Sequence, residues 1–237
     1  MMAEQPTTPA SVGSLSKRIV PRVVIGLGIW GGLLFAAAGT FAWPLAWVQL
    51  GLWLLTVVVN FSVLLRVNPG VVAARLKGQR SSASFERAMI PFFLVGSVAL
   101  PVTAGLDAVR FGWSSPPLWT LWLGLLLHVG GDAIMVWAMA VNPFLEKIVR
   151  IQTERHQQVI TTGPYALVRH PMYTGMILLM AGMPLVLGSW WTFVPVVALT
   201  LGVIIRMLFE EALLRRELPG YKEYAHRTRY RLLPGIW

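Results

Sequence analysis

Two short clusters of ionisable side chains are the strongest candidates for chemistry in this sequence of 237 residues. The first is the adjacent pair Arg169 and His170, and the second is the adjacent pair Glu210 and Glu211. Carboxylates that face cations would suit a zwitterionic ligand, because each charged end of the ligand then meets its opposite. Pro171 restricts His170 to an extended backbone and favours the first turn of a helix, so the basic pair stands at a helix entrance.

A hairpin of two apolar helices would bring the two clusters together. The apolar stretch 173–209 is too long for one crossing of a bilayer, which needs roughly 20 residues. Its middle carries Gly-Ser-Trp-Trp at 188–191, a turn signal followed by interfacial aromatic residues. Both arms cover similar distances at about 1.5 Å per residue, so Glu210 returns beside Tyr173, one helical turn from Arg206.

The composition is that of a protein that dissolves in lipid. Hydrophobic residues make up 56% of the chain and charged residues only 13%, whereas a water-soluble domain carries roughly 25% charged residues. The absence of Cys excludes disulfides, thiol catalysis and Cys-ligated metals. The four His show no metal-ligand spacing, so we expect no metal site.

The predicted fold class is all-α, a polytopic membrane protein with a C-terminal helical hairpin and a cytoplasmic cofactor pocket. About six transmembrane helices are predicted, at 23–42, 45–65, 88–109, 118–140 and in the two arms of 173–209. We divide the chain into a disordered tail, two N-terminal transmembrane helices with a basic loop, and a core with a C-terminal cytoplasmic segment. These parts are 1–16, 17–84 and 85–237.

The placement of basic residues predicts the orientation in the membrane. Of the 20 Lys and Arg, only Arg110 falls outside the connections and ends on one side of the predicted spans. The positive-inside rule makes that side cytoplasmic, so we expect a multi-pass protein of the inner membrane with both termini inside. The net charge of +10 is then explained by attraction of the basic loops to anionic lipid headgroups, and nucleic acid is not an expected partner.

Two ionisable residues lie deep in the fourth predicted span. His128 and Asp132 are four residues apart and share a helix face, with Gly124 and Gly131 close to that face. Either the polar residues form a buried hydrogen-bonded pair that locks helices together, or they line a substrate cavity. The glycines would allow the close approach of another helix or of a ligand.

A longer pattern surrounds the ionisable clusters. It comprises His156, Gly-Pro-Tyr at 163–165, Arg-His-Pro-Met-Tyr at 169–173, the hairpin, Arg206, Glu210-Glu211, and the closing segments 220–224 and 231–234. In this combination the chain from about 85 to 237 resembles the isoprenylcysteine carboxyl methyltransferase family and its phospholipid methyltransferase relatives. The first two predicted spans are less typical of that family.

The resemblance implies a membrane methyltransferase that uses S-adenosylmethionine. Carried over by position, the residues expected around the cofactor are His156, Tyr165, Arg169, His170, Pro171, Tyr173 and Glu210. The residues expected to face the acceptor and serve catalysis are Arg206, Glu211 and Asn142. The methyl group already sits on a good leaving group, so alignment and exclusion of water are the main requirements.

The expected acceptor is lipophilic and enters from the bilayer between helices. For a carboxylate such as an isoprenylcysteine, Arg206 would position the anion and no base is needed. For a phospholipid amine, a proton must leave, and Glu211 would be the candidate base. The sequence does not separate these acceptors, and it does not predict the oligomeric state.

Two other functions compete with methyl transfer. The ending 230–237 also resembles NADPH-dependent sterol-type membrane reductases, although Pro171-Met172 and Glu210-Glu211 favour the methyltransferase pattern. A transporter or scaffold would predict charges along a pore and a repeated half, and the sequence offers neither.

Overall fold

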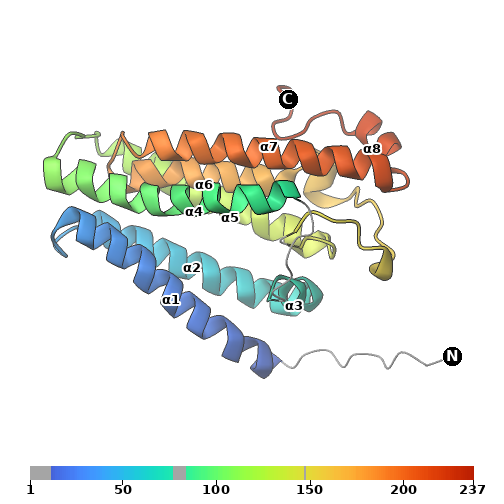
Figure 1. Ribbon diagram of the computed structural model, residues 1–237, viewed down its shortest axis with the longest axis horizontal. Helices are drawn as coiled ribbons and strands as arrows, with labels where there is room; N and C mark the ends of the chain where they lie inside the picture. Colours follow the sequence, from blue (N-terminus) through green and yellow to red (C-terminus); the bar gives the residue numbers. More distant parts are fainter. Residues whose placement is uncertain (1–11, 77–83, 147) are drawn as a thin grey trace.

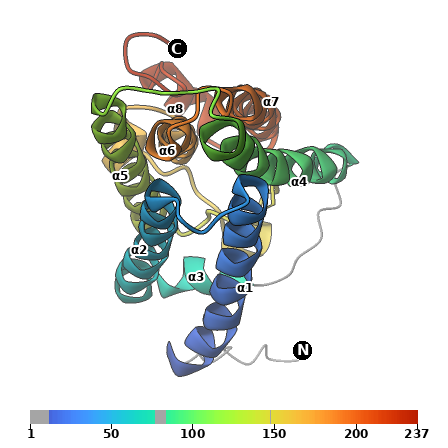
Figure 2. The same cartoon turned by 90° about the vertical axis from the view of Figure 1, so that its left-hand side faces the viewer.

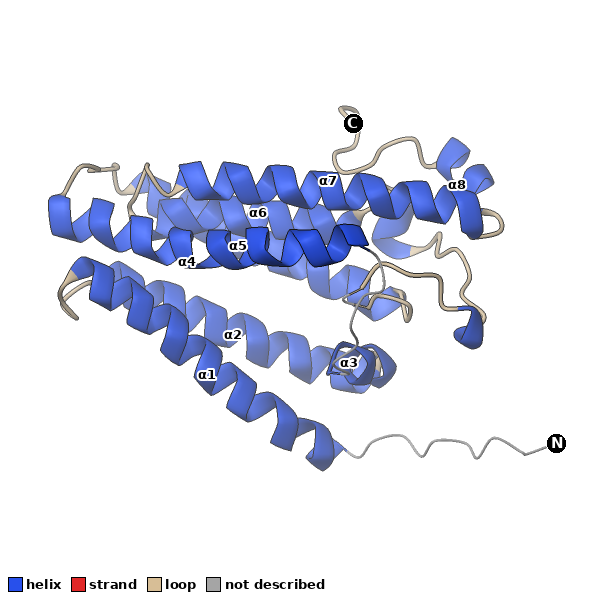
Figure 3. Ribbon diagram, viewed as in Figure 1, coloured by secondary structure: helices blue, strands red, loops and turns tan. Residues whose placement is uncertain are grey.

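The computed structural model describes residues 12–76, 84–146 and 148–237, and all regular structure within them is helical (Figures 1 and 3). The long helices are α1 (Val12–Ala38), α2 (Pro44–Val67), α4 (Ser84–Gly105), α5 (Trp119–Val141), α6 (Pro171–Leu187) and α7 (Phe193–Glu217). The short elements are α3 (Pro69–Leu76), α8 (Tyr221–Arg227), the π-helix η1 (Leu106–Phe111) and the 3-10 helices η2 (Thr153–Arg155) and η3 (Gly163–Ala166). The predicted all-α class is confirmed.

Five of these helices are long and apolar enough to cross a membrane, which makes the protein an integral membrane protein. The exception among the long elements is α6, which is apolar but has only 17 residues, close to the lower limit of about 17 for a crossing. It forms the predicted C-terminal hairpin with α7 and lies between α5 and α7 in the end-on view of Figure 2. Whether α6 is a sixth span stays a prediction.

The N-terminal boundary differs from the predicted one. Helix α1 begins at Val12, so residues 12–16 of the expected disordered tail are helical. Extending an existing helix costs far less than starting one, so the apolar span can propagate back into polar residues. Residues 1–11 lie outside the described part of the chain. The same holds for three basic residues used to predict the orientation, namely Lys77, Arg80 and Lys147.

Four glycines set the distance between α5 and α6. Gly124 and Gly131 of α5 are seven residues apart and face Gly182 and Gly175 of α6, which are also seven apart. A Cβ atom on Gly131 would come within 2.5 Å of the Gly175 carbonyl oxygen, and one on Gly182 within 2.6 Å of the Gly124 oxygen. The two backbones therefore touch, and the predicted close approach at Gly124 and Gly131 is to another helix.

Of the two polar residues deep in α5, Asp132 contacts α2 and not α6. The Asn60 side-chain amide of α2 donates to Asp132 Oδ1 at 2.8 Å, so Asp132 locks α2 to α5. His128 is buried, and neither ring nitrogen has a hydrogen-bond partner among the described residues. Of the two alternatives, the hydrogen bond between His128 and Asp132 is absent, because Asn60 of α2 occupies Asp132 Oδ1 instead.

A buried carboxylate closes the hairpin at the end of the bundle opposite α8. Asp107 of η1 is fully buried and accepts hydrogen bonds from the hydroxyl groups of Ser114 at 2.7 Å and Ser189 at 2.5 Å. The backbone N–H of Trp191 donates to the same oxygen at 3.2 Å. These bonds fasten the turn between α6 and α7 to the end of α4.

We expect Gly131→Ala to destabilise the protein, because the added methyl group would push the backbones of α5 and α6 apart. Overpacking of this kind costs about 1–3 kcal/mol, so the unfolding midpoint should fall by several degrees. Thermal unfolding of the purified protein in detergent, followed by tryptophan fluorescence, measures the change. Gly130→Ala is the matched control, since nothing lies within 4 Å of its Cβ position, and an equal loss in both variants would contradict the close packing.

Candidate functional site

A pocket opens at the α8 end of the bundle, between the loop after α5, the start of α6, the last turns of α7, and α8. The space inside it, including its open mouth, is about 860 Å³. The predicted site residues that line it are Asn142, Tyr165, Arg169, His170, Tyr173, Arg206 and Glu210. The folded hairpin therefore brings together most of the residues that the sequence singled out.

Three predicted site residues do not line the pocket. His156 is exposed and ends η2 with a left-handed backbone, at a φ of 49°. Pro171 is buried as the first residue of α6, where its ring suits the first turn. Glu211 is 2% exposed and lies behind the pocket wall. The predicted ligand-contacting roles of these three residues gain no support from their positions.

Tyr173 joins the two charged residues of α7 that face the pocket. Its hydroxyl group donates to Glu210 Oε2 at 2.5 Å and accepts from Arg206 Nη1 at 2.7 Å. The Arg206 guanidinium also lies 5.9 Å from the centre of the Tyr173 ring. The phenol thus fixes a carboxylate and a cation on one wall of the pocket.

Glu211 is the centre of a buried ion-pair cluster. Its carboxylate oxygens lie 3.0 Å from Arg169 Nη2, 2.8 Å from Arg215 Nη2 and 2.7 Å from Arg231 Nε. His170 Nε2 lies farther away, at 3.6 Å. Because both oxygens of Glu211 are occupied by these cations, its position favours a structural role over the acceptor-facing role predicted from the sequence.

The C-terminal segment clamps the entrance of α6. The backbone N–H groups of Arg169 and His170 donate to the carbonyl oxygens of Tyr230 and Arg231 at 2.9 and 3.0 Å. The guanidinium of Arg169 adds bonds to two further carbonyl oxygens of this segment, and Thr174 donates to a third at 2.8 Å. The basic pair is therefore held in place by the last residues of the chain.

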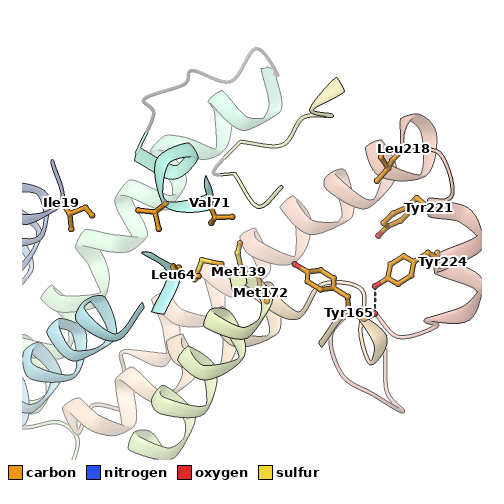
Figure 4. Close-up of a cluster of buried hydrophobic side chains, with 12 residues drawn as sticks. Ile19, Leu64, Val71, Met139, Tyr165, Met172, Leu218, Tyr221 and Tyr224 are labelled. Carbon is orange, nitrogen blue, oxygen red and sulfur yellow. Dashed lines mark hydrogen bonds between the residues drawn. The ribbon is translucent and has the colours of Figure 1, made fainter. Parts of the chain in front are cut away.

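Three buried tyrosines form the wall on the α8 side (Figure 4). Tyr165 accepts a hydrogen bond from the Asn142 amide at 3.1 Å, and the Tyr224 hydroxyl donates to the Tyr165 carbonyl oxygen at 2.8 Å. Burial raises the pKa of Tyr165, Tyr221 and Tyr224 well above the usual phenol value, so all three stay neutral at cellular pH. Tyr221 and Tyr224 were missed as site residues, although the motif 220–224 contained both.

The loop after α5 is held by its own charges. Glu146 accepts two hydrogen bonds from Arg150, at 2.9 and 3.1 Å, and Arg150 also pairs with Glu154 at 2.6 Å. The buried amide of Gln152 donates to the Phe144 carbonyl oxygen at 2.6 Å. This loop covers one side of the pocket, and the sequence analysis did not identify its ion pairs.

The pocket wall contains polar atoms that the protein leaves unpaired. Arg169 Nε and the Tyr221 hydroxyl are buried and have no hydrogen-bond partner among the described residues, and His170 Nε2 has only the Glu211 carboxylate, 3.6 Å away. Leaving such an atom unpaired costs about 1–3 kcal/mol. Because all three belong to residues that line one pocket, the arrangement suits a polar ligand that accepts hydrogen bonds.

We expect Glu211→Gln to destabilise the protein by about 3 kcal/mol or more, because Arg169 and Arg231 would lose their buried counter-charge. Thermal or denaturant unfolding in detergent measures the loss. Glu217→Gln is the control on the same helix, because Glu217 pairs with an exposed Arg216 and an exposed pair contributes only about 0–1 kcal/mol. Equal stabilities of the two variants would show that the buried cluster does not hold the fold.

The comparison with protein families agrees with this geometry. The phospholipid methyltransferase family model matches residues 119–219, which run from the start of α5 to the residue before Gly220 and include α6 and α7. No curated protein matches the chain. The matched segment contains every predicted site residue, and the resemblance inferred from the sequence is confirmed there. The protein is thus an integral membrane protein whose segment 119–219, which supplies most of the pocket lining, is similar to the phospholipid methyltransferase family.

Proposed function

We propose that this pocket binds S-adenosylmethionine and directs its methyl group to a lipophilic acceptor. The observation that carries the proposal is the pair of unpaired buried atoms, Arg169 Nε and the Tyr221 hydroxyl, in residues that line the same pocket as the Glu210 carboxylate. A zwitterionic amino-acid moiety needs both kinds of partner, donors for its carboxylate and an acceptor for its ammonium. The residues present therefore fit the cofactor that the methyltransferase resemblance implies.

Each residue has a defined task in this proposal. Arg169 and the Tyr221 hydroxyl donate to the carboxylate, and Glu210 accepts from the ammonium, held in position by Tyr173. When bound, the cofactor supplies a methyl group on a positively charged sulfur that leaves as a neutral thioether. The protein has to orient the acceptor in line with that methyl group and exclude water, so it needs neither a nucleophile nor a metal.

The acceptor that the contacts favour is a carboxylate, such as that of an isoprenylcysteine. A carboxylate is already nucleophilic and needs no base, whereas an amine must first lose a proton. Glu211, the base predicted for an amine acceptor, has its oxygens occupied by arginine side chains. A phospholipid amine is the second candidate, because the family model that matches this chain is named for phospholipid methylation.

We propose that the pocket faces the cytoplasm and that the acceptor reaches it from the bilayer. The described Arg and Lys side chains gather at the α8 end of the helices, and Arg110 lies at the opposite end. Anionic headgroups attract such a basic end, and the positive-inside rule places it in the cytoplasm with both termini. Cysteine accessibility to a membrane-impermeant reagent tests this orientation.

Calorimetry with the purified protein tests the cofactor. We expect binding of S-adenosylmethionine and none of NADPH, and binding of NADPH alone would instead favour the reductase. Tyr221→Phe should weaken S-adenosylmethionine binding about tenfold or more, the usual effect of losing a hydrogen bond to a charged group. Its unfolding midpoint should not fall, because the hydroxyl group has no partner among the described residues. Unchanged affinity would remove Tyr221 from the site.

Methyl transfer from labelled S-adenosylmethionine into a total membrane lipid extract identifies the acceptor. A carboxylate acceptor yields a methyl ester, which mild base hydrolyses to release the label as methanol. An amine acceptor yields a base-stable N-methyl product that mass spectrometry assigns to a phospholipid. We expect base-labile label, and exclusively base-stable label would overturn the carboxylate assignment.

A further inference from the structure

The segment 229–237, which follows α8, turns back along α7 instead of leaving the bundle (Figure 1). Its Leu232 side chain is 6% exposed. It packs in one cluster with Tyr173 of α6 and with Val203 and Met207 of α7. Because α7 is one of the helices long and apolar enough to cross a membrane, the segment lies against the flank of a membrane-spanning helix.

Apolar side chains of the same segment are left uncovered. Leu233 is 44% exposed, Trp237 39% and Ile236 77%. Exposed apolar side chains that gather in one place mark a surface for contact with a protein or a membrane. On either side of Met207, α7 also exposes Ile205 and Leu208. The uncovered side chains of the segment therefore lie next to side chains of α7 that face lipid.

The other side chains of the segment suit the boundary between lipid and water. Tyr230 and Trp237 have amphipathic rings, which concentrate at that boundary. The Arg231 guanidinium lies 5.3 Å from the centre of the Trp237 ring, and its Nε atom is paired with Glu211 at 2.7 Å. Arg229 is exposed, and its long side chain can reach lipid phosphates. The segment thus carries no unpaired charge that would have to enter the apolar layer.

The backbone of the segment is closed on itself. The N–H groups of residues 231–233 donate to the Trp237 main-chain oxygen at 2.8, 3.0 and 3.3 Å. Those of residues 236 and 237 both donate to the Leu233 carbonyl oxygen at 3.2 Å. A backbone donor without a partner is costly where water is scarce. These internal hydrogen bonds therefore allow the turn to approach lipid.

We propose that the segment 229–237 rests in the interfacial layer of the bilayer at the α8 end of the helices, with Leu233, Ile236 and Trp237 in contact with lipid. The partner is a lipid surface and not a second protein, because the exposed side chains adjoin the lipid-facing flank of α7. This inference goes beyond the proposed methyl transfer and does not depend on it.

An anchor at this place also supports the pocket wall. The carbonyl oxygens of residues 230 and 231 accept hydrogen bonds from the N–H groups of Arg169 and His170 at 2.9 and 3.0 Å. Thr174 donates to the carbonyl oxygen of residue 232 at 2.8 Å. Arg169 and His170 line the pocket, so lipid contact at residues 233–237 steadies the backbone that carries them.

Fluorescence quenching in lipid nanodiscs tests the lipid contact, and the absence of Cys from the chain allows single labelled positions. We expect a probe on Ile236→Cys to lose fluorescence when the nanodiscs contain phosphatidylcholine with a nitroxide on its acyl chain near the headgroup. Leu201→Cys, an exposed position within α7, is the positive control and should also be quenched. Glu223→Cys, exposed on α8, is the negative control, which only water-soluble acrylamide should quench strongly.

Three results would overturn the proposal. The first is lipid quenching at position 236 that is no greater than at position 223. The second is a lack of lipid quenching at position 201, because the flank of α7 would then not face lipid. The third is protection of the probe at 236 from both quenchers, which would show that protein covers the segment. Leu233→Cys provides a second position if the Ile236 variant does not fold.

Hydrogen exchange in nanodiscs tests the support of the pocket wall. We expect Ile236→Asp to increase exchange in the peptide that contains Arg169 and His170, because a carboxylate avoids lipid and the loosened segment releases their N–H groups. Ile236→Leu keeps the apolar contact and should exchange like the parent. Equal exchange in the Asp and Leu variants would refute the support of the wall. The measurement needs no S-adenosylmethionine, so its outcome is independent of the test of the proposed function.

Discussion

The buried carboxylate of Glu211 holds the entrance of α6, the end of α7 and the C-terminal segment together at one point. Three arginine side chains surround it at 2.7 to 3.0 Å. A buried carboxylate without such partners would cost several kcal/mol, so the arginines have to stay where the fold puts them. Arg169 comes from the entrance of α6 and Arg231 from the C-terminal segment. The pocket wall is therefore built around a charge that does not itself line the pocket.

The two adjacent carboxylates of α7 have different surroundings: Glu210 lines the pocket and Glu211 lies in the buried ion-pair cluster. Successive residues on a helix point about 100° apart, so Glu210 and Glu211 face different parts of the protein. Glu210 turns to the pocket and is held by Tyr173, while Glu211 turns to the ion-pair cluster. A pair of carboxylates that looks uniform in sequence thus occupies two separate environments.

The N-terminal helices contribute more to the site than their weak resemblance to any family indicated. Asn60 of α2 holds Asp132 of α5, and α3 packs beneath the pocket through Val71 and Val72. Hydrogen bonds between helices are useful anchors within a membrane, where apolar side chains gain little from contact with one another rather than with lipid. These contacts hold α2 against α5, and α3 against a buried cluster that includes the pocket residues Tyr165 and Met172.

The membrane class, the helical hairpin and the approach of Tyr173 to Glu210 followed from the sequence alone. Composition and apolar length are local properties, and two arms of similar length must return to the same level. A close approach at Gly124 and Gly131 was also signalled by the sequence, although it left open whether a helix or a ligand makes that approach.

Only the tertiary structure decided which side chains line the pocket. The exposure of His156, the withdrawal of Glu211 from the pocket and the arrival of Tyr221 at its wall depend on the rotation of helices and the path of loops. The spacing of residues along the chain determines neither the rotation of a helix about its axis nor the path of a loop. The partner of Asp132 shows the same limit, since residue spacing indicated the helix face but the packing of α2 against α5 selected Asn60.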